Sequence, residues 1–234
     1  MTHMGLVREE NEDAALMLDE VGFWAVVDGM GGHEEGRWAA ATLVSAMTSL
    51  HPAGDFEADC RQVVDTIGTA NQAVLRGAKA RNTISGATMV ALLLQGRRFA
   101  CFWAGDSRLY RLRNDELAQI SHDQTQVQQL VDAGLLTAAE ARVHPRAHLV
   151  LNAVGVRSRL KVETVTGEAR PADRFLLCSD GLTDVVADSE IACELGASEP
   201  REAARRLVDL TLERGAPDNV TVIVVACEVG VDLR

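Results

Sequence analysis

The chain has 234 residues, 47% hydrophobic and 24% charged, a composition typical of a globular protein that can bury a substantial core. Its net charge of −11 and scattered basic residues argue against a nucleic-acid partner, and no apolar run reaches the roughly 18 residues of a membrane span. The acidic excess fits either simple solubility or bound cations. The N-terminus lacks the apolar core of a signal peptide, and the five cysteines form no C-x-x-C pair, so we expect a cytoplasmic protein.

Apolar runs and their breaks predict an alternation of strands and helices. Three runs in the middle of the chain follow one another through glycine-containing breaks and predict an antiparallel meander. The last run, VTVIVVAC, is almost entirely apolar and predicts a strand buried on both faces. In chain order, we predict strand 22–27, helices 34–50 and 59–80, meander strands 88–95, 98–104 and 107–113, strands 160–166 and 173–179, helix 200–214 and strand 220–227.

Residues 121–159 differ from the rest, because they are polar and carry only two short helical patterns, at 125–133 and 137–142. We interpret this segment as an insertion between two strands. No repeat or Pro/Ser-rich linker divides the chain, so we expect one domain over residues 1–234. Strands early and late in the chain, with helices between them, favour two sheets covered by helices.

Four aspartates stand where the most apolar runs begin or end. Asp28 follows FWAVV, Asp106 follows FACFWAG, Asp180 follows FLLCS and Asp218 precedes VTVIVVAC. Taken singly, each is an ordinary turn residue, because aspartate beside glycine or asparagine favours turns. If the four ends converge, however, the carboxylates would repel one another in a desolvated pocket unless cations lay between them.

Carboxylate ligands favour hard cations such as Mg²⁺ or Mn²⁺ over zinc. Two such ions ~3.5–4 Å apart can generate a nucleophilic hydroxide and hold the oxygens of a phosphoryl group. The stretch VVDGMGGHEEG fits this chemistry, because Gly29 beside Asp28 lets a backbone carbonyl approach an ion without an intervening Cβ. A phosphate-binding loop is the weaker alternative, because the stretch matches neither G-x-G-x-x-G nor G-x-x-x-x-G-K-[ST].

The N-terminal segment VREENEDA places a cation, Arg8, ahead of several acids. Such a segment is either a solvated charged face or, beside an acidic metal pocket, a source of phosphate contacts. A guanidinium can hold two oxygens of a phosphate monoester at once.

Seven segments in order carry a family resemblance: VREENEDA, VVDGMGGH, SGATMVALLL, WAGDSRLYRLR, HPRAHLVLNAVG, LLCSDGLTDVV and APDNVTVIVV. Together they resemble the PP2C-type (PPM) metal-dependent serine/threonine protein phosphatases of the bacterial branch, from Gly5 to Ala226. The resemblance implies an α+β fold, an α-β-β-α sandwich of two antiparallel sheets flanked by helix pairs. It also implies that the insertion at about 121–159 is a variable flap beside the active site.

The resemblance further implies a metal centre. Asp28 matches the family's metal-bridging aspartate, and Gly29 matches its carbonyl ligand. Asp180 and Asp218 match the late metal-binding aspartates, and Asp106 matches the aspartate that bacterial members use for a third ion. The implied cofactors are therefore two Mn²⁺ or Mg²⁺ ions, with a third at Asp106.

By the same resemblance, Arg8 matches the arginine that grips phosphate, and Glu12 and Asp13 match an acidic pair that supports the metal shell through waters. Animal members carry a histidine directly after the Asp-Gly pair, whereas this chain has Met30 there. The nearest histidine, His33, is either a proton donor to the leaving group or a loop histidine near solvent.

The implied reaction is attack of a metal-bound hydroxide on phosphoserine or phosphothreonine in proteins, opposing a serine/threonine kinase. We expect a monomer that binds neither nucleic acid nor membrane. One alternative is a pseudoenzyme that binds phosphoproteins, which the intact set of core acids disfavours. Another is an enzyme for a different small phosphomonoester, which comparison of phosphopeptides with nucleotides would distinguish.

Overall fold

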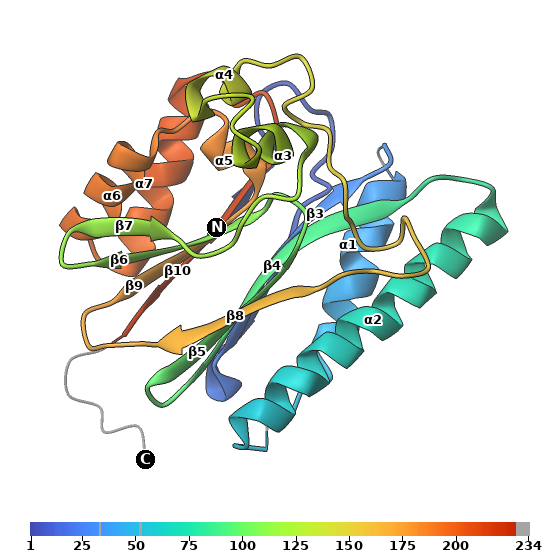
Figure 1. The fold of residues 1–234 in the computed structure, drawn as a ribbon, viewed down its shortest axis with the longest axis horizontal. Coiled ribbons are helices and arrows are strands. Elements are labelled where there is room, and N and C mark those ends of the chain that lie inside the picture. Colours follow the sequence, from blue (N-terminus) through green and yellow to red (C-terminus); the bar gives the residue numbers. More distant parts are fainter. Residues whose placement is uncertain (33, 52, 228–234) are drawn as a thin grey trace.

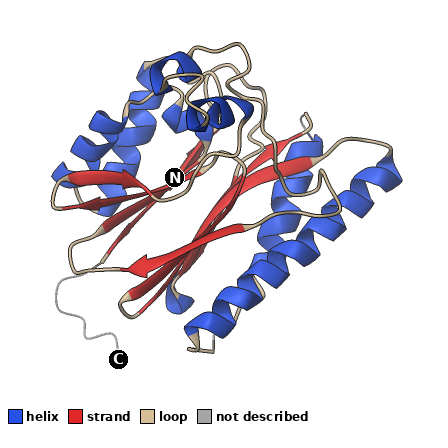
Figure 2. Cartoon of the chain, in the orientation of Figure 1, coloured by secondary structure: helices blue, strands red, loops and turns tan. Residues whose placement is uncertain are grey.

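Two five-stranded antiparallel sheets pack face to face, with helices on both outer faces (Figures 1 and 2). The structure is a computed structural model, and it describes residues 1–32, 34–51 and 53–227. One sheet has the order β2 (Ala14–Leu18), β3 (Phe23–Met30), β4 (Gly86–Gln95), β5 (Arg98–Ala104) and β8 (Glu163–Glu168). The other has the order β1 (Thr2–His3), β10 (Val220–Ala226), β9 (Arg174–Cys178), β6 (Arg108–Arg113) and β7 (Glu116–Gln119).

Three apolar clusters hold these layers together. Helices α1 (Glu34–Met47) and α2 (Phe56–Arg81) cover the first sheet, and α6 (Asp188–Ala197) and α7 (Pro200–Glu213) cover the second. The third cluster lies between the sheets. Strand β3 shows how one sequence serves two clusters, because Phe23 and Val27 face the helices while Trp24 and Val26 face the other sheet. The expected sandwich of two sheets flanked by helix pairs is confirmed.

Most predicted elements are present with ends shifted by a few residues. Helix α2 begins earlier than expected because Asp55 caps it, its side chain accepting a hydrogen bond from the Ala58 N–H at 3.0 Å. Strand β10 is buried on both faces, as its composition predicts. The residue patterns predict none of the short elements β1, β2, β7, η1 (Asp19–Val21), α5 (Asp180–Thr183) and α6.

The predicted antiparallel meander is wrong at its third strand. β4 and β5 pair as expected, but β6 lies in the other sheet, between β9 and β7. The chain crosses between sheets at Gly105, whose φ of +114° favours glycine and whose added Cβ would lie 2.4 Å from the Thr88 side chain. Residue patterns along the chain do not show this crossing, because the rough alternation of polar and apolar residues in β6 would fit a third meander strand equally well.

The segment at 121–159 contains only α3 (Gln126–Asp132), α4 (Ala138–Arg142) and irregular chain, and it lies over one end of the sandwich (Figure 1). Two isolated bridges fasten it, Thr125 with Val150 and Ala87 with Val154. Because Ala87 belongs to β4, the second bridge fixes the segment beside the end of β3. Among the described residues, no helix is long and apolar enough to cross a membrane.

Candidate active site

The four aspartates at strand ends meet at one end of the sandwich. Strands β3 and β5 both run antiparallel to β4, so Asp28 at the end of β3 and Asp106 after β5 lie at the same edge. In the other sheet, Asp180 follows the end of β9, and Asp218 precedes the antiparallel strand β10. Pairing between distant strands therefore assembles a cluster that no single segment contains.

A cavity of about 250 Å³ lies at this end. Its lining includes a cation, a backbone glycine and acids from both sheets. Seven of the residues singled out in the sequence line it: Arg8, Glu12, Asp28, Gly29, Asp106, Asp180 and Asp218. The role predicted for His33 falls on a residue outside those described. Met30 lines the cavity at the position where animal members of the resembled family carry histidine.

The carboxyl groups of this cluster oppose each other's ionisation. Burial raises the pKa of Asp28 well above its ordinary value, and the charges of Asp13 and Asp180 raise it further. Burial and the neighbouring Asp184 raise the pKa of Asp180 to about 6. Burial and Asp180 likewise raise the pKa of Asp106. Without a compensating positive charge, the cluster would hold protons at neutral pH.

Asp13 lies behind the cavity with one oxygen held and one without a partner. The Ser179 hydroxyl donates to Asp13 Oδ2 at 2.9 Å, whereas no hydrogen-bond partner among the described residues reaches the buried Oδ1. Burial raises the pKa of Asp13 to about 7, although contacts with the hydroxyls of Thr221 and Ser179 act to lower it. A buried carboxylate oxygen left in this state calls for a bound water or cation.

Arg8 stands at the rim of the cavity, with its side chain 54% exposed. Its Nη2 donates to Asp218 Oδ2 at 2.6 Å. Asn219 fixes the N-terminal segment that carries Arg8, because its Nδ2 donates to the Glu10 carbonyl at 2.9 Å and its Oδ1 accepts from the Glu12 N–H at 2.8 Å. The exposed remainder of the guanidinium can reach an anion that enters the cavity.

Gly29 is required by its surroundings. A Cβ at this position would lie 2.3 Å from the Gly36 carbonyl oxygen and 2.7 Å from the Glu12 carbonyl oxygen. Its N–H donates to the Glu12 carbonyl at 3.3 Å. Glycine therefore lets the N-terminal segment and α1 close tightly around the residue beside Asp28.

The donor set fits hard divalent cations. Carboxylates and a backbone carbonyl are the oxygen ligands that Mg²⁺ and Mn²⁺ prefer. The raised pKa values and the unpartnered Asp13 oxygen show that protein groups alone leave the negative charge uncompensated. Divalent ions in the cavity would supply that compensation.

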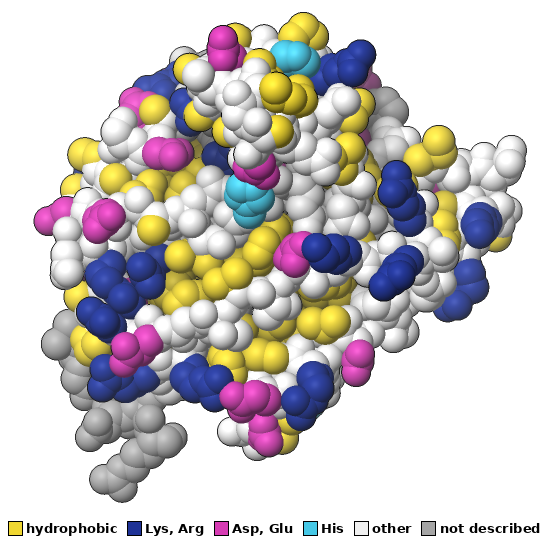
Figure 3. Space-filling view, viewed as in Figure 1, with side chains coloured by type: hydrophobic (Ala, Val, Ile, Leu, Met, Phe, Trp, Pro, Cys, Tyr) yellow, Lys and Arg dark blue, Asp and Glu magenta, His cyan; other side chains and the backbone are white. Residues whose placement is uncertain are grey.

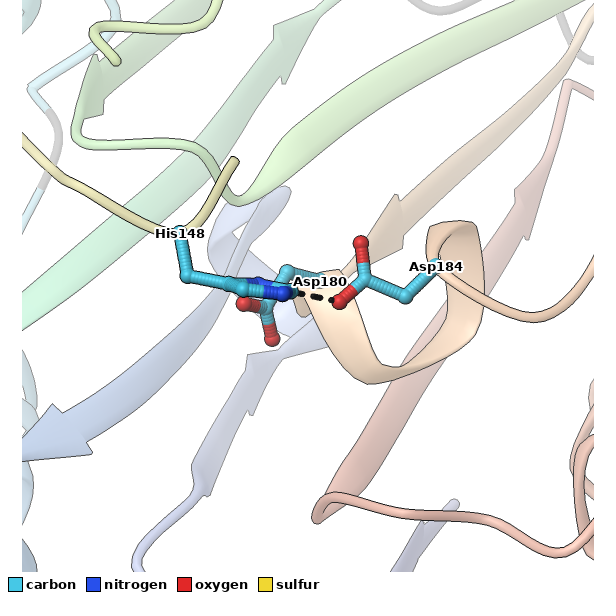
Figure 4. Close-up of side chains that lie close together, drawn as sticks. All are labelled: His148, Asp180 and Asp184. Atoms are coloured by element: carbon cyan, nitrogen blue, oxygen red, sulfur yellow. Dashed lines mark ion pairs between the residues drawn. The ribbon is translucent and has the colours of Figure 1, made fainter. Parts of the chain in front are cut away.

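Two further residues of the site, His148 and Asp184, do not stand out in the sequence. His148 comes from the segment at 121–159 and points toward Asp180 and Asp184 of the α5 turn (Figure 4). Its Nδ1 lies 3.4 Å from Asp184 Oδ2, and the three side chains offer ligand atoms within 4.8 Å of one another. Neither residue follows an apolar run, so only the docking of the segment onto α5 shows the grouping.

A second cavity, of about 430 Å³, opens beside the first and shares three of its lining residues, Asp106, His148 and Asp180. One wall carries a well-formed ion pair, in which Arg108 Nη2 lies 2.7 Å from Asp123 Oδ2. This pair ties strand β6 to the start of the segment at 121–159. The two cavities together give the acidic cluster a broad opening under that segment.

Comparisons with known proteins agree with this site. The sequence profile described as protein phosphatase 2C matches residues 7–219. The serine/threonine protein phosphatase PstP of Mycobacterium tuberculosis is 39% identical over 225 residues, which are 94% of this chain but 43% of PstP, so the chain spans less than half the length of that relative.

Two solved structures have closely similar folds. The first is "PppA, a key regulatory component of T6SS in Pseudomonas aeruginosa", with a TM-score of 0.91, 40% identity and coverage of 97% of this chain and 95% of that one. The second is the PstP catalytic domain in complex with two manganese ions, with a TM-score of 0.86, 38% identity and coverage of 96% and 94%. With the profile match across most of its length, the chain belongs to the protein phosphatase 2C family.

Proposed function

We propose that this protein is a Mn²⁺- or Mg²⁺-dependent phosphatase that hydrolyses phosphoserine and phosphothreonine in proteins. The observation that carries the proposal is the group of mutually repelling aspartates from both sheets around one cavity, with Arg8 at its rim. The serine/threonine phosphatases among its relatives, one of them solved with two manganese ions, support the same chemistry.

In this proposal, Asp28, Asp180, Asp218 and the carbonyl of Gly29 hold the two core ions, and Asp106 contributes to a third. When bound, such ions activate water and neutralise charge on phosphoryl oxygens. Their positive charge also keeps the aspartates ionised, which burial and mutual repulsion otherwise oppose.

The remaining residues bind and orient. Arg8 holds the phosphate oxygens with its exposed guanidinium edge, and its contact with Asp218 sets the direction of that edge. Asn219 keeps the Arg8 segment on the body of the protein. Glu12 and Asp13 support the metal shell from behind, and the Ser179 hydroxyl fixes the orientation of Asp13.

The proposed partners are phosphorylated proteins and a serine/threonine kinase whose phosphorylation of them this enzyme removes. The proposed location is the cytoplasm. The site supports a protein substrate because the cavity is broad and open under the segment at 121–159.

The test is hydrolysis of a phosphothreonine peptide by chelator-stripped protein, with and without millimolar Mn²⁺ or Mg²⁺. We expect turnover only with metal, and slower turnover of nucleoside monophosphates under the same conditions. A folded protein that hydrolyses no peptide with either ion would support the pseudoenzyme alternative. Faster turnover of nucleotides than of every phosphopeptide would assign a different substrate class.

A further inference from the structure

Two stretches of this acidic protein carry cations without any acid. The chain carries 34 acidic residues, yet residues 143–162 and residues 70–81 contain none. Both stretches are rich in cations, and Figure 3 shows dark-blue side chains over the C-terminal half of α2 and over the chain that leads into β8. We call Arg76, Lys79, Arg157 and Arg159 the basic patch; all four are exposed.

Hydrogen bonds fix the two halves of the basic patch against each other. Asn71, itself 1% exposed, donates from Nδ2 to the Arg157 carbonyl at 3.0 Å and accepts from the Gly155 N–H at 2.7 Å. Gln72 donates to the Ser158 carbonyl at 2.6 Å. The backbone that carries the two arginines is therefore held on α2 before any ligand arrives, which lowers the ordering cost of binding.

The α2 members of the patch lie on the same side as this contact. Arg76 is one turn beyond Gln72, and Lys79 is about two turns beyond it, so all three share one helix face. The four cations thus border one strip of surface, with the chain at 157–159 along its edge.

The basic patch lacks the internal neutralisation found elsewhere on the surface. Over residues 1–32, 34–51 and 53–227, none of its four members forms an ion pair, whereas Arg205 pairs with Glu202 and Arg214 pairs with Glu190. The next cation along the chain, Lys161, is paired with Glu163. The patch is therefore open to negative charge from another molecule.

The chain that carries Arg157 is fixed close to the proposed catalytic cavity. Val154 exchanges backbone hydrogen bonds with Ala87 of β4, at 2.9 and 3.0 Å, next to the residue that pairs with Asp28. Val156 and the cavity-lining Met30 both lie against Gly86. From Val154 to Arg157 is three residues, at most about 10 Å of chain.

We propose that the basic patch binds an acidic segment of the substrate protein, a few residues to one side of the phosphorylated residue. This inference rests on the proposed phosphatase function and names its preferred substrates. The four cations are exposed, so their attraction to Asp and Glu is weak for each pair and adds up over several pairs. The preference is therefore for several acids and not for one sequence. The effect is electrostatic and is weakened by salt.

The experiment compares matched phosphothreonine peptides that carry either acidic or neutral residues at three to five positions from the phosphothreonine, on each side in turn. The measured quantity is the ratio of kcat/KM for the acidic peptide to that for the neutral peptide. We expect a ratio of about three to ten when the acids lie on one side of the phosphothreonine, and the difference should be in KM. The ratio should fall toward one in 0.5 M NaCl. The double variant Arg157→Gln/Arg159→Gln should lose most of this ratio.

The matched control is Arg61→Gln/Arg201→Gln, which removes the same charge from two exposed arginines that have no ion pair among the described residues and lie outside the patch. The control should keep the wild-type ratio. An unchanged ratio in the patch variant, or an equal loss in the control, would overturn the proposal.

Failure of the phosphatase function itself has a separate signature, because no peptide would then be hydrolysed. In that case, fluorescence anisotropy of the acidic peptide with plain threonine measures binding without catalysis. The patch variant should raise its Kd at least about threefold, while the control does not. Equal Kd values for wild type and patch variant would reject the patch independently of activity.

Discussion

The two ends of strand β9 each carry an aspartate, and the two carboxyl groups behave in opposite ways. Asp173, before β9, is 1% exposed, and although burial raises its pKa, hydrogen bonds from Arg113 and the Arg170 N–H bring it below the ordinary value. Arg113 holds both oxygens, at 2.7 and 2.6 Å. Burial also raises the pKa of Asp180, after β9, but there the neighbouring Asp184 and Asp218 add to the effect and the pKa reaches about 6.

The presence of donors that compensate the carboxylate charge therefore separates a structural acid from a functional one better than burial does. Asp173 has a guanidinium and a backbone donor that satisfy its charge. Asp180 faces Asp184 and Asp218 instead. A protein that keeps such a group keeps it for a ligand that supplies the missing positive charge.

The largest expected effect comes from removing charge at the cavity end. Asp28→Asn should lower phosphopeptide turnover by at least about a hundredfold, because a proposed metal ligand is lost. The same change should raise the melting temperature of the metal-free protein by about 2–4 °C, the shift that ~1 kcal/mol gives a domain of this size. A neutral amide removes the cost of keeping a carboxyl group where burial and the charges of Asp13 and Asp180 oppose its ionisation. The exposed Asp65→Asn on α2 is the control and should change neither. Wild-type turnover by Asp28→Asn would refute the metal assignment.

Removing charge at the other end should have the reverse consequence. Asp173→Asn leaves Arg113 without its buried partner and should cost about 3–5 kcal/mol in the free energy of unfolding, measured with urea. Turnover per folded molecule should stay near wild type, because Asp173 does not line either cavity at the acidic end. Asp209→Asn breaks an exposed ion pair with Arg205 and should cost at most about 1 kcal/mol. Equal costs would remove the contrast between the two ends.

Metal binding should act on the cavity end alone. At a concentration of Mn²⁺ one hundred times its Kd, linkage predicts about 2.7 kcal/mol of added stability for a single site. Thermal unfolding of the wild type should show the corresponding upward shift, and Asp180→Asn should show much less of it, because a ligand is missing. Mn²⁺ should raise the melting temperature of Asp173→Asn by as much as that of the wild type, although the metal-free variant melts at a lower temperature. A full shift in Asp180→Asn would place the ion elsewhere.

The two ends of the metal-free protein should also show a pH dependence of opposite sign. Burial raises the pKa of Asp180 to about 6 and that of Asp13 to about 7, so the folded state binds more protons than the unfolded chain between about pH 4 and 7. Stability from this end therefore falls as pH rises through that window. The lowered pKa of Asp173 gives stability that is present above about pH 4 and is lost below it.

The free energy of unfolding, measured with urea between pH 3 and pH 7, tests both pH dependences. The metal-free protein should be most stable near pH 4–5, and saturating Mn²⁺ should abolish the decline toward pH 7. A metal-free protein that becomes steadily more stable from pH 4.5 to pH 7 would contradict the repulsion inferred at the cavity.

Much of the fold and of the candidate site follows from local sequence patterns. The period of apolar residues predicts α1, α2 and α7, and composition predicts that β10 is buried on both faces, because these are properties of neighbouring residues. The same patterns place aspartates at strand ends. Short elements such as β2 and α6 are not predicted, because five to ten residues contain too few repeats of the apolar pattern to be recognised.

The sequence by itself determined the kinds of elements, the acids at their ends and the glycine beside Asp28, since local periodicity and residue chemistry decide these. Only the tertiary structure decided that β6 changes sheet, that His148 meets Asp184, and that Asn71 holds the chain at 155–157 on α2. These contacts join residues far apart in the chain. Their energies depend on the packing of whole layers, which no local pattern records.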